Sequence, residues 1–299
     1  MDIVTHAGIG VIAAAPFMAD RPELGLGLVA GSVLPDLDAF YRLIDKRSFL
    51  QAHQTWSHAL PIQLLVSIGA GFCAHFGGGN GLALAAGLFA GLAGHTLLDL
   101  TNTFGVALFK PLTNRRFCVE WVFFIDAIML LATAIALGFV VPGLLRGEPV
   151  QAWRRAAYFS FIAAYVISKG ALRRRAAKLL PEAQSLVPSA LVPWQFFHAQ
   201  TRQDAVVVQR LNVLTGTTVA VGQVPVLDAP FLEVLQGLPE FRLMREVSPE
   251  YHVVSTTTEG NSTHLLCRDM RTRNFGTRFG DLEVWLDADH KVTRSVFHV

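Results

Sequence analysis

The sequence predicts an all-α polytopic membrane domain, a helical bundle of about six apolar helices, followed by a small, mostly β soluble domain. Hydrophobic residues make up 52% of the chain and charged residues 16%, with a mean hydropathy of +0.41. A typical soluble domain carries about 25% charged residues, so membrane insertion is expected. Hydropathy and turn residues divide the chain into a membrane-embedded domain (1–180), a proline-containing linker (181–193) and a soluble α+β or mostly β domain (194–299).

Six apolar runs carry the membrane prediction. They are Ala7–Ala19, Leu24–Leu34, Ala59–Phe76, Leu82–Leu98, Trp121–Val141 and about Ala156–Ile167. A spanning helix needs roughly 20 apolar residues, and three of the runs meet or approach that length. The first two runs and the last are short, and they span only if flanking polar residues reach the interface or a cavity lined by protein.

The region after Trp194 has a different pattern. Short alternating segments are separated by Asp, Gly and Asn, which is typical of strands joined by turns. The expected strands are Ala205–Arg210, Thr217–Val221, His264–Arg268, Glu283–Leu286 and Thr293–Phe297.

Charge and cysteine content exclude several classes of protein. The net charge of +2 is too small to indicate a nucleic-acid partner. The three cysteines are odd in number and far apart, which argues against a disulfide framework and against a cysteine metal cluster. No basic segment precedes the first apolar run, so no cleaved signal peptide is expected.

Ionisable residues inside the apolar half are the strongest functional signal, because such groups are costly in a membrane and usually mark a site. The candidate metal ligands are His6, Asp36, Asp38, His53, His58, His95, Asp99 and Asp126. Three of them, Asp36, Asp38 and His58, are also the expected catalytic residues. For any one of these positions taken alone, a hydrogen-bonded core histidine or a helix-capping aspartate is an alternative, and Asp126 also suits the positive end of a helix dipole.

Spacing and topology favour a shared site. His95 and Asp99 are four residues apart, so a helix presents both side chains on one face. Pro35 breaks the second run and places Asp36 and Asp38 at its end. If successive runs alternate in direction, all the candidate positions fall on one side of the membrane.

The ligand types indicate the chemistry. A mixed His and Asp set without thiolates suits zinc, with manganese or iron as alternatives, and it is too large for one tetrahedral zinc ion. We therefore expect two or more divalent ions, which would activate water for the hydrolysis of a phosphoester.

The order of these motifs resembles that of the bacterial and archaeal family of membrane-bound metal-dependent hydrolases typified by YdjM. The matching motifs are Thr5-His6, Pro35-Asp36-Leu37-Asp38, His53 with His58, and His95 with Asp99 before Thr101-Asn102-Thr103-Phe104-Gly105. The resemblance covers about residues 1–178. It implies a distant similarity to zinc-dependent phospholipase C and P1-type nucleases, and hence phosphoester hydrolysis.

One position departs from that family pattern. An arginine usually follows the first histidine of the pair, whereas Gln54 follows His53 here. If that arginine holds an anionic substrate, its role passes to Lys110, Arg115 or Arg116 or is lost.

The expected partners are membrane lipids and a small or lipid-like substrate. The alternatives to a hydrolase are a metal-ion or proton-coupled transporter and a non-catalytic scaffold with a structural metal. The cluster Arg173, Arg174, Arg175 and Lys178 follows the last run, so the positive-inside rule predicts a protein of the inner membrane whose metal site and C-terminal domain face the cytoplasm.

Overall fold

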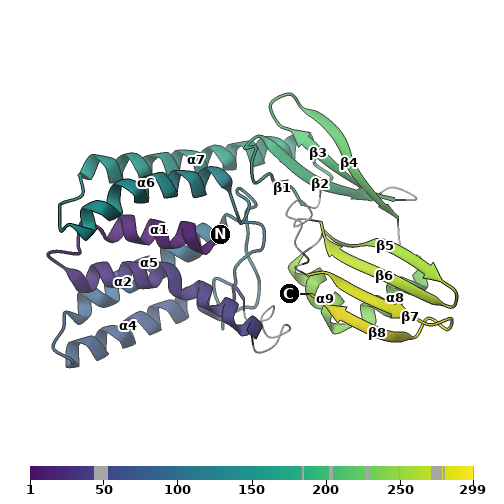
Figure 1. Cartoon of the computed structure of the whole chain (residues 1–299), viewed down its shortest axis with the longest axis horizontal. Helices are drawn as coiled ribbons and strands as arrows, with labels where there is room; N and C mark the ends of the chain where they lie inside the picture. Colours follow the sequence, from purple (N-terminus) through teal and green to yellow (C-terminus); the bar gives the residue numbers. More distant parts are fainter. Residues whose placement is uncertain are drawn as a thin grey trace. The chain divides into compact units, whose positions relative to one another are not determined.

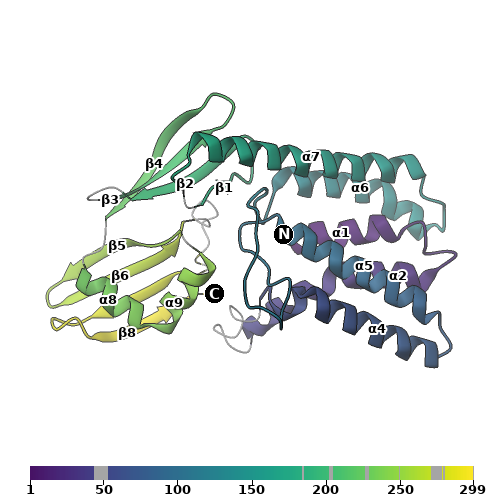
Figure 2. The same ribbon diagram turned by 180° about the vertical axis from the view of Figure 1, so that it is seen from behind.

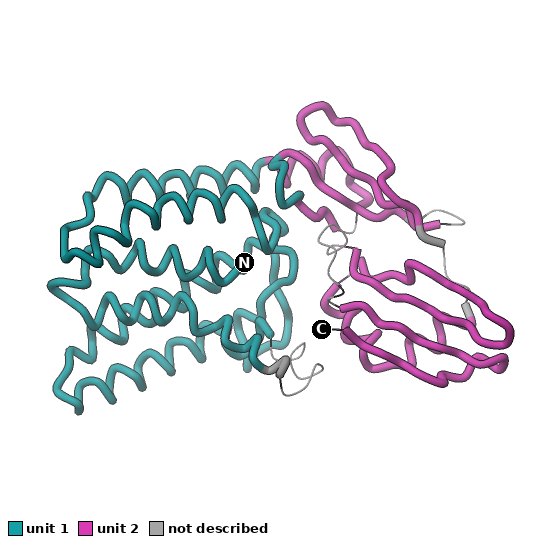
Figure 3. Tube along the Cα trace, viewed as in Figure 1, with its two compact units in different colours: residues 1–40, 52–171, 189–193 teal, residues 41–51, 172–188, 194–299 magenta. Residues whose placement is uncertain are grey.

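The computed structural model of the chain describes residues 1–43, 53–183, 185–201, 205–225, 229–248, 250–270, 278 and 280–298. These residues form two compact units (Figure 3). Unit 1 comprises residues 1–40, 52–171 and 189–193, and unit 2 comprises residues 41–51, 172–188 and 194–299, in each case within the described ranges.

Unit 1 is helical. Its α-helices are α1 (Ile3–Ala14), α2 (Pro22–Val33), α4 (Leu60–Phe76), α5 (Gly81–Leu100), α6 (Ala127–Leu145) and the first part of α7 (Ala152–Leu179). Two 3₁₀ helices, η1 (Leu34–Leu43) and η2 (Trp56–His58), lie between α2 and α4.

Local residues explain where these helices begin and end. Asp2 caps α1 by accepting a 2.8 Å hydrogen bond from the Thr5 amide. Asn80 caps α5 in the same way, through the Ala83 amide at 3.1 Å. Pro35 follows the end of α2, and from Leu34 the backbone continues as the tighter helix η1, which carries Asp36 and Asp38.

Helix α5 packs against both α2 and α4, and α1 packs against α2 and α6 (Figure 2). Glycines Gly27 and Gly31 of α2 face Gly87 and Gly91 of α5, so the two backbones touch directly. On the other side of the bundle, Ile12, Met129 and Val140 are buried together with side chains of α7. The first contact holds α5 against α2, and the second joins α1, α6 and α7.

Unit 2 contains two four-stranded antiparallel sheets (Figure 1). The first has the order β1 (Val187–Pro188), β2 (Gln195–Thr201), β3 (Ala205–Asn212) and β4 (Thr217–Pro225). The second has the order β5 (Tyr251–Glu259), β6 (Ser262–Asp269), β7 (Leu282–Leu286) and β8 (Val292–Phe297). Neighbouring strands follow one another along the chain, as in simple meanders.

Each sheet has its own apolar core. In the first, Phe196 and Leu211 are buried with Ala176 of α7. In the second, Leu265 and Val284 are buried with residues of α8 (Ala229–Gly237) and α9 (Pro239–Val247). Helices therefore take part in both cores of the C-terminal unit.

The prediction of a polytopic bundle of about six membrane helices is wrong. In the described parts of the chain, only α5 and α6 are long and apolar enough to cross a membrane. Helices α1 and α2 have 12 residues each, which is about 18 Å at 1.5 Å per residue, against a bilayer core of about 30 Å. Helix α7 has 28 residues but includes charged residues such as Arg155 and Lys169.

The C-terminal unit combines helices with strands. Within the described residues, α8, α9 and the end of α7 pack with the two antiparallel sheets, so unit 2 is α+β, one of the two forms expected for residues 194–299, and not the mostly β domain of the fold prediction.

Apolar side chains cover the outer faces of α4 and α6. Leu65, Phe72, Leu131 and Phe139 are each about 60% exposed, at 64%, 61%, 62% and 59%. Such exposed apolar surface suits contact with lipid.

Candidate metal centre

Four side chains from three segments converge at one end of unit 1. Asp36 lies in η1, His58 ends η2, and His95 and Asp99 lie one turn apart on α5. One ligand atom from each lies within 4.8 Å of the others. We call these four residues the cluster. His58, His95 and Asp99 are buried, and Asp36 is half-buried.

Short distances hold the cluster together. His58 Nε2 lies 3.1 Å from Asp99 Oδ2 and 3.2 Å from His95 Nε2. His95 Nε2 lies 3.5 Å from Asp36 Oδ1. The Nδ1 atom of His95 donates a 2.9 Å hydrogen bond to the Ser32 carbonyl, so α5 is tied to the last turn of α2. This bond also fixes Nε2 as the basic atom that faces the cluster.

The donor set fits a divalent cation. Two imidazole nitrogens and two carboxylate oxygens are ligands that zinc, manganese and iron accept. Asp36 Oδ2 and His6 Nδ1 are buried without a hydrogen-bond partner, although buried polar atoms are normally paired. Burial lowers the pKa of His6 and of His58 well below the usual imidazole value, so both rings are neutral near pH 7. A neutral imidazole is the form that binds a metal ion.

Three further candidates surround the cluster. The His6 ring stacks on His95 with centroids 3.6 Å apart, and its Nε2 lies 3.1 Å from Asp99 Oδ1. The amino group of Met1 also contacts Asp99 Oδ1. Asp38 lies beside the cluster: its Oδ1 is 2.6 Å from His53 Nδ1, and its Oδ2 is 3.7 Å from His58 Nδ1. The structure thus brings seven of the eight sequence candidates to one place.

Asp126 has a different position. Its Oδ1 accepts hydrogen bonds from the amides of Ile128 and Met129, at 3.1 and 3.2 Å, and caps α6. The Tyr165 hydroxyl donates to both of its oxygens, at 3.0 and 2.9 Å. These contacts are those of a helix cap tied to α7, the alternative that the sequence left open for this residue.

Sequence reasoning missed several uncharged residues that contact the candidate ligands. Gln54 Nε2 donates to Asp99 Oδ2 at 3.1 Å, and Asn102 Nδ2 donates to Asp99 Oδ1 at 3.2 Å. Ser57 donates to Asp38 Oδ2 at 2.6 Å. Gln63 is a further polar residue near the site: its Nε2 donates to Thr96 Oγ1 at 2.7 Å and ties α4 to α5. A glutamine inside the apolar run 59–76 is a sequence signal that could have identified this residue.

Lys110, Arg115 and Arg116 were the candidates to replace the missing arginine of the family pattern. Among them, Arg116 contacts the backbone of the segment that carries His53. Its Nη2 donates to the His53 carbonyl at 3.0 Å and its Nη1 to the Gly105 carbonyl at 3.3 Å. Lys110 lies over the Trp56 ring and Arg115 over the Phe117 ring. Arg116 is therefore the cation best placed beside the site.

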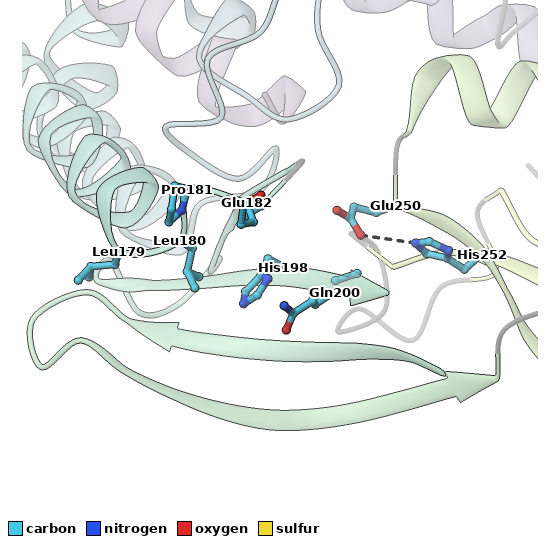
Figure 4. Close-up of a pocket in the computed structure, with 10 residues that line it drawn as sticks. Leu179, Leu180, Pro181, Glu182, His198, Gln200, Glu250 and His252 are labelled. Carbon is cyan, nitrogen blue, oxygen red and sulfur yellow. Dashed lines mark ion pairs between the residues drawn. The ribbon is translucent and has the colours of Figure 1, made fainter. Parts of the chain in front are cut away.

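Unit 2 has a separate group of titratable residues (Figure 4). His198, Glu250 and His252 line a cavity of about 470 Å³, and Glu250 lies 3.6 Å from His252. Burial lowers the pKa of His198. Within the described residues, these side chains do not converge as the cluster does.

The fold and the site together define a membrane-associated protein with a buried His/Asp cluster that could hold a metal ion. Residues 1–176 match the family model described as YdjM inner membrane protein. This match spans more than half of the chain, and the chain belongs to the YdjM inner membrane protein family. Comparison with curated proteins and with solved structures gives no match.

Proposed function

We propose that the protein is a metal-dependent hydrolase of the inner membrane that cleaves a phosphoester of a lipid-like or amphiphilic substrate. The observation that carries the proposal is the convergence of Asp36, His58, His95 and Asp99, with Asp38 and His53 beside them. The motif order, which resembles that of membrane-bound metal-dependent hydrolases, supports the same reaction class. A divalent cation held by the cluster would supply a Lewis acid for a phosphoryl oxygen and lower the pKa of water.

The protein's own residues suit the proton transfers of hydrolysis. His53 is 28% exposed at its side chain, while Asp38 beside it is 5% exposed, so His53 lies at the open edge of the site. His53 Nδ1 donates a 2.6 Å hydrogen bond to Asp38 Oδ1, which leaves Nε2 as the acceptor atom of the ring. His53 Nε2 is then suited to take a proton from the attacking water and to pass it to the leaving oxygen, and Asp38 to orient the ring.

An amphiphilic substrate suits the surroundings of the site. The cluster lies at the C-terminal end of α5, one of the two helices in the described residues that are long and apolar enough to cross a membrane. Exposed apolar side chains Leu37 and Phe40 of η1, 41% and 62% exposed, flank Asp36 and Asp38. The tail of a bound lipid would contact these side chains, and the phosphate of its headgroup would lie near Arg116.

Metal analysis and activity measurements test the proposal on the detergent-purified full chain. We expect bound zinc, manganese or iron, and turnover within a panel of phosphoesters and phospholipids that a chelator abolishes and added metal restores. If the metal-loaded protein in liposomes moved divalent ions without hydrolysing any phosphoester, the transporter would replace this proposal. Bound metal with neither activity would favour the structural scaffold.

We further infer that the metal centre faces the cytoplasm. Segment 101–126, which joins α5 to α6 at the cluster end, carries Lys110, Arg115 and Arg116. Tyr165 contacts Asp126 at the start of α6, so α7 continues past this same end toward its basic cluster at 173–178. At the other end of α6, Arg146 is paired with Glu148 at 2.9 Å, which reduces the net charge there. Basic loops remain on the cytoplasmic side.

Reporter fusions test this orientation. A fusion after Lys178 is expected to give a cytoplasmic signal, and one within segment 143–151 a periplasmic signal. The reverse pair of signals would place the metal centre outside.

A further inference from the structure

Gln54 combines two features that are unfavourable for folding. Its φ angle is +57°, in the left-handed region that residues other than glycine seldom adopt. Its side chain is also 4% exposed, and Oε1 is buried without a hydrogen-bond partner. A strained backbone and an unpaired buried oxygen at one residue call for a functional explanation.

The backbone contacts show what holds this conformation. The Gln54 amide donates to Asp38 Oδ2 at 3.0 Å, and its carbonyl accepts a 3.0 Å hydrogen bond from the Ala107 amide. With both backbone groups fixed, the side chain is directed toward Asp99.

The orientation of the side-chain amide follows from its partner. Asp99 Oδ2 can only accept, so the Gln54 nitrogen, 3.1 Å away, must face it. Oε1 is therefore turned away from that carboxylate. The same Asp99 oxygen lies 3.1 Å from His58 Nε2, which places the Gln54 amide directly against the cluster.

Gln63 provides an internal comparison. Its Oε1 is also buried without a partner, but its nitrogen contacts Thr96 Oγ1 and the Ser57 carbonyl rather than a cluster residue. Gln54 differs in that its nitrogen donates to a candidate ligand, Asp99.

We propose that Gln54 is a positioning residue of the metal centre: its Nε2 orients Asp99, and its Oε1 accepts a hydrogen bond from the water used in hydrolysis. The second role rests on the proposed function, whereas the first requires only that the cluster binds metal. Residues that orient metal ligands typically change metal affinity by about 10–100-fold when they are replaced.

The test uses Gln54→Met, which keeps the side-chain length and removes both hydrogen-bonding groups, in the detergent-purified full chain. Co²⁺ is the probe, because its visible spectrum reports coordination geometry without turnover. We expect Co²⁺ to bind about 10–100-fold more weakly with a changed spectrum. We also expect kcat to fall about 100-fold while KM stays within about twofold, because a misplaced reacting group costs on that order.

The matched control is Thr133→Val, which removes a buried hydroxyl of α6 whose partners are the Tyr158 hydroxyl at 2.8 Å and the Met129 carbonyl at 2.7 Å, neither of them in the cluster. This variant should keep the wild-type Co²⁺ spectrum and affinity. A wild-type spectrum and affinity in Gln54→Met would overturn the inference about Asp99, and an unchanged kcat would overturn the inference about water. Wild-type protein that binds no Co²⁺, zinc or manganese would instead refute the metal centre, and with it both proposals.

Discussion

Replacement of Asp99 by asparagine is expected to remove metal binding almost completely, with a loss of affinity greater than about 100-fold. That loss exceeds the 10–100-fold effect typical of residues that only orient a ligand. Asp99 is buried and lies within 3.1 Å of both His6 and His58. The substitution keeps the shape of the side chain but removes the negative charge that attracts a cation. Metal content per protein and zinc affinity in detergent are the measurements.

The matched control is Asp126→Asn, because Asp126 is equally buried but caps α6 instead of facing the cluster. We expect this variant to keep its metal and to melt close to the wild type, because asparagine caps a helix about as well as aspartate. Full metal content in Asp99→Asn would contradict the assignment of the cluster. Loss of metal from Asp126→Asn would instead return Asp126 to the set of ligands.

The candidate site could be predicted largely because charge in an apolar segment is costly. This argument selected His6, His58, His95 and Asp99 without any knowledge of their contacts. It did not separate Asp126 from them, because a helix cap also favours aspartate. Gln54 was not found as a site residue, since an uncharged residue in a short irregular segment has no periodicity and little apparent cost.

The fold was less predictable from hydropathy. The six apolar runs all contain helices, but an apolar run does not reveal whether lipid or protein covers it. In α2, Gly27 and Gly31 pack against α5, so this helix is apolar for a protein contact and too short to span. In unit 2, the alternating strands were found where β3, β4, β6, β7 and β8 lie. The two helices α8 and α9 were missed because each has only nine residues.

The contact between α2 and α5 connects packing to the metal centre. A methyl group at Gly31 would lie 2.4 Å from the Leu88 carbonyl oxygen and 2.7 Å from the Leu92 amide nitrogen. Both atoms belong to the α5 backbone, so they cannot move aside as a flexible side chain could. Gly31 lies five residues before Asp36, and Leu92 lies three before His95. Any separation of the helices therefore moves Asp36 away from His95.

Gly31→Ala is accordingly expected to weaken metal binding by about tenfold or more and to destabilise unit 1 by about 1–3 kcal/mol, the usual cost of overpacking. Gly94→Ala on α5 is the matched control, because no atom lies within 4 Å of the added methyl group. Since alanine favours a helix over glycine by about 1 kcal/mol, this variant should bind metal normally and melt no lower than wild type. Zinc titration and thermal unfolding in detergent compare the two. Equal metal affinity in both variants would mean that the position of α2 does not set the geometry of the cluster, and that η1 places Asp36 independently of the helix before it.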